Sequence, residues 1–281
     1  MIELASNRYG KAAIRLVRVA RGPGGDKLRD LTVAIALEGD FTAAHTDGDN
    51  ANVIATDTMK NTAYAFAKDH LDGPLEDYGR ALAEHFLASP QVDVATVNIK
   101  GHHWHAIDVA GTPAPDAFVR GGEGTRVATI SATSAGTTVE AGVEDLVVMK
   151  TTRSAFSGFP RDQYTTLPET DDRLMATKVT AIWRYGSPDL DFDAVFLDVR
   201  TTLLEVFAEH DSPSVQTSIW IMAKAILDRH DEVDEVRMVL PNLHHWLVDL
   251  RPFGLENDRE IYTPTTEPHG LIEATVRRGE G

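Results

Sequence analysis

The sequence contains no cysteine among its 281 residues. Disulfides, thiolate metal sites and cysteine nucleophiles are therefore excluded, and the chain suits a reducing compartment. No uninterrupted apolar stretch approaches the roughly 20 residues that span a bilayer, and Met1 to Asn7 lacks the basic and then apolar pattern of a signal peptide. Arg277 to Gly281 carry no recognisable sorting signal. We expect a cytoplasmic protein without a membrane segment.

Positive charge is also scarce. The 27 lysines and arginines stand against 43 aspartates and glutamates, which leaves a formal net charge of −16. Proteins that bind duplex nucleic acid carry basic patches that neutralise phosphates, so we expect no nucleic-acid partner. The hydrophobic share of 42% and the charged share of 25% are those of an ordinary globular protein. The length allows one large domain or two of typical size and weakly favours two.

Several signatures of common chemistry are missing. There is no G-x-S-x-G elbow, no Walker loop and no G-x-G-x-x-G dinucleotide motif. The clusters His102-His103, with His105 beyond, and His244-His245 lack the H-E-x-x-H spacing of a catalytic zinc helix. Consecutive histidines in a strand point to opposite faces, so at most one of each pair can serve a given site. We therefore predict no metal site and interpret most of these histidines as satisfied or exposed.

Apolar periodicity predicts the elements of the first half. Alternation at Val33, Ile35 and Leu37, after a glycine-rich turn, indicates the second strand of an antiparallel hairpin. Spacings of three and four from Leu75 to Phe86 indicate an amphipathic helix. The expected elements are, in order, strands around 14–19 and 33–37, helices beginning at Thr56 and Leu75, and strands at 92–99 and 127–130.

The second half repeats this order. A hairpin from about 143 to 183, helices over 192–210 and 215–226, and a strand at 233–240 are expected. Residue similarity supports a duplication, because Val92-Asp93 precedes His102-His103-Trp104 much as Val233-Asp234 precedes His244-His245-Trp246. Ala65 to Lys68 likewise resembles Val206 to Glu209. We predict an α+β fold of two domains, residues 1–138 and 139–281, joined in the Ser-, Thr- and Gly-rich stretch 135–144.

The densest group of reactive side chains lies in the segment from Val53 to Thr62, VIATDTMKNT. Thr56 and Asp57 stand where a helix is expected to begin. Both residue types favour the N-cap, because their oxygens accept hydrogen bonds from unpaired N–H groups. Capping alone is one interpretation of this cluster, and a reactive site at the helix entrance is the other.

Further polar groups stand at the ends of predicted elements. Tyr9-Gly10-Lys11 opens the first strand, and Asn242-Leu243-His244 closes a strand in the second half. Lysine, threonine and histidine can pass a proton among themselves. The stretch from 150 to 216 adds an aromatic ring, a planar guanidinium fork and an amide that both donates and accepts.

These motifs resemble, in order and over nearly the whole length, those of the urate oxidase family, the cofactor-independent uricases. They are Y-G-K, T-D-x-x-K-N-T, K-T-T-x-S-x-F-x-x-F, a D-R pair eight residues beyond Tyr164, S-V-Q and N-x-H. The resemblance implies two tandem tunnelling-fold (T-fold) domains, each an antiparallel sheet backed by helices, in a homotetramer around a central tunnel. It also implies oxidation of urate by O2 and water to 5-hydroxyisourate and hydrogen peroxide, with no metal or other cofactor.

The resemblance also assigns the site residues. The implied proton relay consists of Lys11, Thr56 and His244. The implied substrate-binding residues are Thr56, Asp57, Phe156, Leu167, Arg173, Val215, Gln216, Asn242 and Ile272. In the family, the first part of the relay and the substrate clamp come from different subunits. The doubled His244-His245 is resolved by the motif, since only His244 stands two residues after Asn242.

Two alternatives remain open. One is a pterin- or GTP-pathway hydrolase of the same fold, although those enzymes usually anchor the ring with a glutamate, and here Arg173 and Gln216 take that place. The other is a non-catalytic purine-binding protein derived from a uricase, which would not require the whole relay. The peroxisomal tripeptide of eukaryotic members is missing, which favours a bacterial cytoplasmic enzyme.

Overall fold

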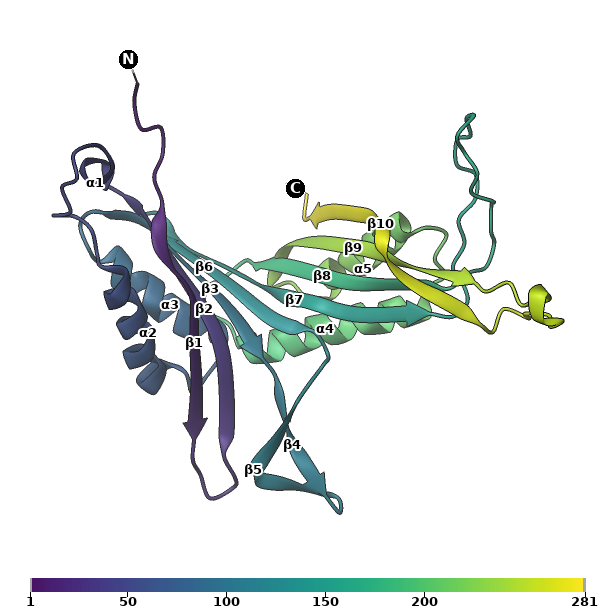
Figure 1. The fold of residues 1–281 in the computed structure, drawn as a ribbon. Helices are drawn as coiled ribbons and strands as arrows, with labels where there is room; N and C mark the ends of the chain where they lie inside the picture. The colour runs from purple at the N-terminus through teal and green to yellow at the C-terminus, as the bar shows by residue number, and fades with distance from the viewer. Residues whose placement is uncertain (1, 280–281) are drawn as a thin grey trace. The chain divides into compact units, whose positions relative to one another are not determined.

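The computed structural model describes residues 2–279 as two compact units (Figure 1). The first unit comprises Met1–Gly142 and Arg184–Phe196, and the second comprises Val143–Trp183 and Leu197–Gly281. Met1, Glu280 and Gly281 lie outside the described residues. The expected absence of sorting signals stays an expectation. The domain boundary after residue 138 stays a prediction.

The first unit is an antiparallel sheet with helices packed on it. Its elements are β1 (Tyr9–Ala20), β2 (Lys27–Gly39), α1 (Thr42–Thr46), α2 (Thr56–His70), α3 (Leu75–Leu87), β3 (Val92–His102), β4 (Trp104–Val109), β5 (Thr112–Arg120) and β6 (Thr125–Thr133). The strands pair in the order β1-β2-β3-β6, and β4 pairs with β5 in a separate hairpin. Helix α3 packs on β3 and β6, and α2 packs on β1. The predicted hairpin, helices and strands are thus confirmed.

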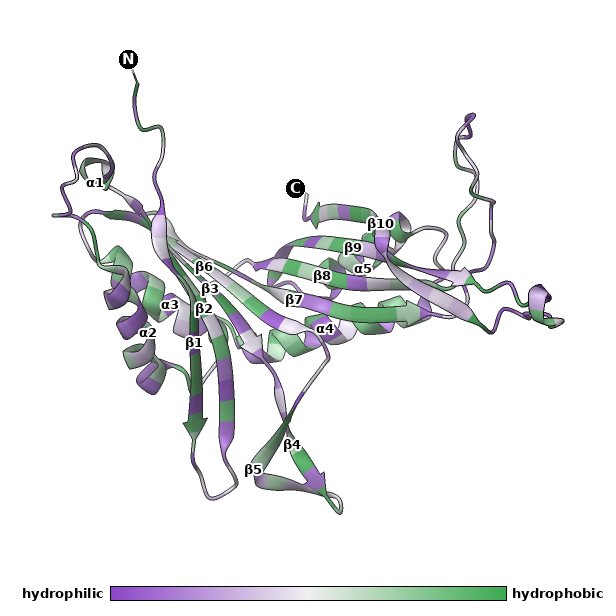
Figure 2. Cartoon of the chain, viewed as in Figure 1, coloured by the Kyte–Doolittle hydropathy of each residue, from purple (hydrophilic) through white to green (hydrophobic). Residues whose placement is uncertain are grey.

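Residue alternation explains why this sheet has one buried face. On β2, the side chains of Leu31, Val33, Ile35 and Leu37 are at most 1% exposed, and the residues between them are half-buried. Figure 2 shows the corresponding alternation of apolar and polar bands along the strands. On α3, Gly79 allows close packing, because a Cβ there would lie 2.4 Å from Cδ1 of Ile130.

The second unit repeats the order of two strands, two helices and two strands. Its elements are β7 (Gly136–Lys150), β8 (Met175–Tyr185), α4 (Phe192–Glu209), α5 (Val215–Arg229), β9 (Val233–Leu247), the 3-10 turn η1 (Arg251–Phe253) and β10 (Tyr262–Arg277). The ends of β7, β8 and α4 belong to the first unit. The strands pair in the order β7-β8-β9-β10. Phe66 on α2 and Phe207 on α4 occupy the first long helix of each half, as the duplication predicts.

The sequence did not predict α1, β4, β5 or β10. Residues of β4 and β10 are exposed or half-buried throughout. A strand that buries neither face carries no period-two apolar signal, so periodicity cannot reveal it.

Candidate active site

Lys11 lies on β1 beside a β-bulge. Lys11 pairs with Ile35 and Ile14 pairs with Val33, so β1 carries one more residue than β2 between these pairs. Within this bulge Ala13 adopts a φ of 56°. Bulges bend a strand and redirect its side chains. The side chain of the half-buried Lys11 has no hydrogen bond or ion pair within residues 2–279, which leaves its ammonium group available for chemistry.

Helix α2 begins at Thr56, as predicted, but the capping interpretation is wrong. The N-cap is Ala55, and no side chain caps the helix. Thr56 and Asp57 instead occupy the first helical turn, where a carboxylate is favoured by the helix dipole. The hydroxyl of the half-buried Thr56 makes no side-chain hydrogen bond in the part of the chain that the structure describes.

Asp57 is held by Lys60 and Asn61, two further residues of the T-D-x-x-K-N-T motif. Lys60 Nζ donates a hydrogen bond to the Asp57 carboxylate, and Asn61 Nδ2 donates another at 3.0 Å. The hydrogen bond and charge of Lys60 lower the pKa of Asp57, and the charge of Lys11 lowers it further. Lys11 therefore lies within electrostatic reach of the entrance to α2, and these residues form the first-unit group of candidate residues.

In the second unit, the backbone brings Phe156 and Arg173 side by side. Phe156 and Thr170 exchange N–H···O bonds of 2.8 and 3.0 Å, and the Arg173 N–H donates to the Ser154 carbonyl at 2.8 Å. The Arg173 Cζ atom lies 5.3 Å from the Phe156 ring centroid. Burial lowers the pKa of Arg173, and its buried Nε has no partner among the described residues. An aromatic face beside a guanidinium group with unused donors suits a flat anion.

The K-T-T and D-R motifs anchor this loop. Lys150 Nζ donates to the Ala208 carbonyl at 3.1 Å, and Arg153 Nη1 donates to the Glu209 carbonyl at 2.8 Å. These cations satisfy carbonyl groups that the end of α4 leaves unpaired. The Asp172 carboxylate accepts a hydrogen bond from the Arg153 N–H at 2.8 Å. Asp172 is thus structural, whereas its neighbour Arg173 stays available for a ligand.

The same loop is joined to the start of α5. Ala155 donates its N–H to the Ser212 carbonyl at 2.7 Å, and Ser212 donates to the Arg153 carbonyl at 2.9 Å. Ser214 caps α5 by accepting a hydrogen bond from the Thr217 N–H at 3.2 Å. Val215 and Gln216 are therefore the first helical residues, whose N–H groups have no partner inside the helix and can bind an anion.

Asn242, His244 and Ile272 lie where the ladder between β9 and β10 is interrupted. Ile272 pairs with Leu240, Gly270 with Asn242, and Thr265 with His244, so β10 carries extra residues between 265 and 270. Asn242 and His244 share one face of β9, because residues two apart in a strand point the same way. Both side chains are half-buried.

His244 has three charged neighbours, of which His269 is not among the residues singled out from the sequence. Burial lowers its pKa, and the charges of Arg173, His269 and His245 lower it further. The Trp246 ring stacks on His244 at 5.4 Å between centroids and 24° between planes. A neutral imidazole at pH 7 is able to accept a proton. His269 was missed because it precedes Gly270-Leu271-Ile272 in a strand without periodicity.

The candidate residues divide between the two units. Lys11, Thr56 and Asp57 belong to the first unit. Phe156, Leu167, Arg173, Val215, Gln216, Asn242, His244 and Ile272 belong to the second. Leu167 is 42% exposed in the loop between β7 and β8.

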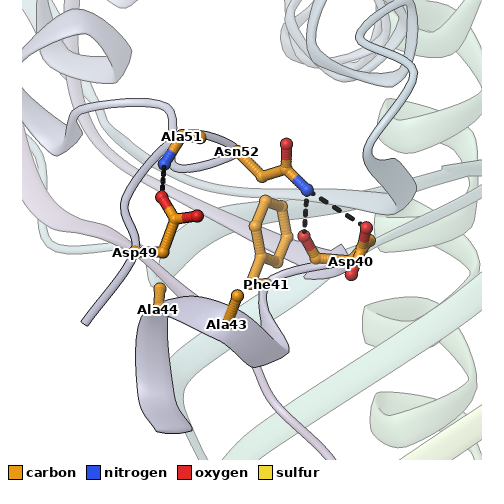
Figure 3. A pocket seen from close by; sticks show the side chains of 7 residues that line it. All are labelled: Asp40, Phe41, Ala43, Ala44, Asp49, Ala51 and Asn52. Atoms are coloured by element: carbon orange, nitrogen blue, oxygen red, sulfur yellow. Dashed lines mark hydrogen bonds between the residues drawn. The ribbon is translucent and has the colours of Figure 1, made fainter. Parts of the chain in front are cut away.

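The pocket in Figure 3 belongs to the first unit and contains no candidate residue. It is lined by Asp40, Phe41, Ala43, Ala44, Asp49, Ala51 and Asn52. Asn52 Nδ2 donates to the Asp40 carbonyl at 3.0 Å, and the Ala51 N–H donates to Asp49 Oδ1 at 2.9 Å. These bonds brace the segment that leads into α2.

Between residues 2 and 279, no three or more Asp, Glu or His side chains are arranged to hold a metal ion. No helix in the same range combines the length and apolar character needed to cross a membrane.

Comparison with known proteins decides the family. The sequence model described as Uricase matches residues 7–131 and 139–273. The uricase of Arthrobacter globiformis is 45% identical over 280 residues, which cover 99% of this chain and 90% of that protein. The chain belongs to the uricase family. The uricase of Dictyostelium discoideum is 38% identical, with 99% and 98% of the two chains covered.

Solved uricase structures have the same fold. The crystal structure of the Arthrobacter globiformis uricase matches with a TM-score of 0.94 at 43% identity, covering 100% of this chain and 96% of that one. The Bacillus fastidious uricase matches with a TM-score of 0.84 at 25% identity, covering 96% and 93%. The predicted fold class, tandem T-fold domains with antiparallel sheets, and the predicted enzyme class, a urate oxidase, are confirmed. Because the chain belongs to the uricase family, the alternative of a pterin- or GTP-pathway hydrolase is wrong.

Proposed function

We propose that this uricase-family enzyme oxidises urate with O2 and water to 5-hydroxyisourate and hydrogen peroxide, without a metal or other cofactor. The observation that carries the proposal is the free Arg173 guanidinium 5.3 Å from the Phe156 ring. Urate is a flat anionic purine, for which a ring face and an adjacent fork of donors are complementary.

The second-unit residues would bind the substrate. Phe156 stacks on the purine ring, Arg173 donates to adjacent acceptors, and Gln216 supplies a donor and an acceptor to an amide-like edge. The Val215 N–H and the Leu167 side chain complete the pocket, and Ile272 closes one wall. The backbone of Asp57, which belongs to the first-unit group, contacts the substrate as well. A steering field is not expected, because the net charge of −16 repels an anion.

The relay would move the protons of the reaction. Two electrons and two protons pass from urate to O2, which becomes hydrogen peroxide, and water adds its oxygen to the oxidised purine to give 5-hydroxyisourate. Lys11, Thr56 and His244 transfer protons, and Asn242 with Thr56 holds dioxygen or water above the ring. Positioned acids and bases of this kind contribute roughly 10²- to 10⁴-fold to rate.

The active enzyme would be a homotetramer around a central tunnel, acting in a bacterial cytoplasm. Lys11 and Thr56 of one subunit would meet the clamp of another, so a monomer would have no complete site. We expect dissociation to abolish activity. Sedimentation combined with a urate absorbance assay tests this, and a fully active monomer contradicts it.

Aerobic incubation of the metal-free protein with urate tests the reaction itself. The expected result is loss of urate absorbance with formation of hydrogen peroxide. Failure to react, or a requirement for added metal, contradicts the proposal. Lys11→Ala and Thr56→Ala should lower turnover more than they weaken binding of a urate analogue, and unchanged turnover in both variants contradicts the relay.

A further inference from the structure

We propose that Tyr9 is a positioning residue for the relay. Its hydroxyl fixes the entrance of α2 against β1 and so sets the geometry between Lys11 and Thr56. This inference rests on the proposed function, because it gives Tyr9 a task only if Lys11 and Thr56 act together.

One hydroxyl binds both backbone groups of a single residue. The Ile54 N–H donates to Tyr9 Oη at 2.8 Å, and Tyr9 Oη donates to the Ile54 carbonyl at 3.2 Å. Tyr9 stands two residues before Lys11, and Ile54 stands two residues before Thr56. The two bonds therefore join β1 to the segment before α2. On each side the joined residue stands two positions before a relay residue.

The Tyr9 ring is itself held in place. Its edge packs against Phe41, with 4.7 Å between centroids and 82° between the ring planes. Burial raises the pKa of Tyr9, which keeps the hydroxyl a donor at the pH of the reaction. Phe41 lies beside Asn52 in the pocket of Figure 3. The Tyr9 ring thus packs on a residue of the same pocket that braces the segment before α2.

The segment before α2 is also held from its other side. Gln91 Nε2 donates to the Asn52 carbonyl at 3.1 Å, and Asn52 Nδ2 binds Asp40. Between these bonds and the helix, the hydroxyl of Tyr9 connects the segment to β1 by its two hydrogen bonds to Ile54. Tyr9 lies in the regular part of the ladder between β1 and β2, just before the bulge that follows Lys11. Because the bulge interrupts the ladder, the strand there is fixed by fewer regular hydrogen bonds.

The neighbouring glycine has a separate task. A Cβ on Gly10 would lie 1.9 Å from the Ile35 carbonyl oxygen, so only glycine allows β1 to approach β2 at this point. The Y-G-K motif therefore combines a tether, a close backbone approach and the relay lysine.

A double-mutant cycle in the full-length enzyme tests the inference. Tyr9→Phe, Thr56→Ala and the double variant are compared by kcat and KM for urate and by the Kd for xanthine, a purine that lacks the 8-oxo group. Tyr9→Phe should lower kcat about tenfold, the order expected when one hydrogen bond is lost. The Kd for xanthine should stay unchanged. In the Thr56→Ala background, Tyr9→Phe should cause no further loss, because residues that act through one another are not additive.

Tyr64→Phe is the matched control, because Tyr64 is exposed on α2 and should leave kcat unchanged. If Thr56→Ala itself leaves kcat unchanged, the relay role proposed for Thr56 fails, and with it the basis of the inference about Tyr9. If Thr56→Ala lowers kcat but Tyr9→Phe does not, or if the two losses multiply, the assignment of Tyr9 is overturned.

A second variant covers the case in which Tyr9→Phe does not fold. Phe41→Leu keeps the Tyr9 hydroxyl and removes the ring that supports it. It should lower kcat in the parent enzyme and have no effect in the Thr56→Ala background. A loss of kcat that persists in that background, or that follows the fraction of folded protein, overturns the inference.

Discussion

The guanidinium group of Arg173 lies over the Phe156 ring, with Cζ 5.3 Å from the ring centroid. Two backbone pairings hold them there, one between Phe156 and Thr170 and one between Arg173 and Ser154. The Phe156 ring also stacks on Phe159 of the same loop, with 4.9 Å between centroids and 14° between planes. Among the described residues the Arg173 side chain makes none of the loop's hydrogen bonds, so its donors are available for a ligand. Because the backbone of Arg173 holds the loop, a change of its side chain should affect ligand binding more than folding.

Arg173→Lys should raise the KM for urate about tenfold or more, because the ammonium keeps the charge but loses the planar fork of donors. Steady-state kinetics by urate absorbance measures this. Arg161→Lys is the matched control, since Arg161 also lies over a phenylalanine, Phe159, at 5.7 Å but is exposed. Equal effects of the two substitutions would show that Arg173 does not grip the substrate.

A buried ion pair stabilises the first unit. Arg126 Nη2 lies 2.8 Å from the carboxylate of Glu76, whose side chain is fully buried. Burial raises the pKa of Glu76, and the charge of Arg126 opposes this. Arg126→Met should lower the free energy of unfolding by about 3–5 kcal/mol, because it leaves a buried carboxylate unpaired. Chemical denaturation at fixed protein concentration measures the change.

The control for this pair is Arg229→Met. Arg229 lies 3.3 Å from Glu205, and both side chains are about half exposed. Exposed pairs contribute about 0–1 kcal/mol, so this substitution should change stability little. A loss at Arg126 no larger than at Arg229 would contradict a stabilising role for the buried pair.

Gly10→Ala should destabilise the first unit by about 2 kcal/mol or more, because the new Cβ would collide with the backbone of Ile35. Thermal unfolding measures the change. Gly24→Ala is the control, since a Cβ at Gly24 meets nothing within 4 Å. Equal melting temperatures for the two variants would show that the strand accommodates the side chain.

His210 should make the fold sensitive to acid. Burial lowers its pKa, and its ring contacts the Val206 carbonyl and the Ser218 hydroxyl at 2.7 and 2.8 Å. As the pH falls through the ordinary histidine pKa of about 6.5, the unfolded chain takes up a proton that the folded chain resists. Stability should therefore fall over this range and level off below the folded pKa.

Denaturation of His210→Gln across pH 5–8 isolates this contribution. The difference in the free energy of unfolding should shift in favour of the variant as the pH falls. His45→Gln, at an exposed position on α1, controls for the loss of a histidine in general. A difference between the His210→Gln variant and the parent that does not change with pH would contradict the prediction.

Periodicity was sufficient for elements that bury one face. It located the hairpin of β1 and β2, the helix α3 and the core of β9, where apolar residues repeat every two or every three to four positions. It could not locate β4, β5 or β10, which bury no continuous face. Local statistics also misjudged Thr56, since the N-cap is Ala55 and the cap has no side-chain partner.

The sequence by itself determined the duplication, the fold class, the family and the types of group available for chemistry, because these depend on residue identity and spacing along the chain. Only the tertiary structure decided which of these groups are free. It assigned Asp172, Lys60 and Tyr9 to hydrogen bonds, and it left the side chains of Arg173 and Lys11 without a hydrogen bond or ion pair in the described chain. The bonds of Asp172 and Tyr9 join residues 19 and 45 positions apart, and spacing along the chain carries no record of such contacts.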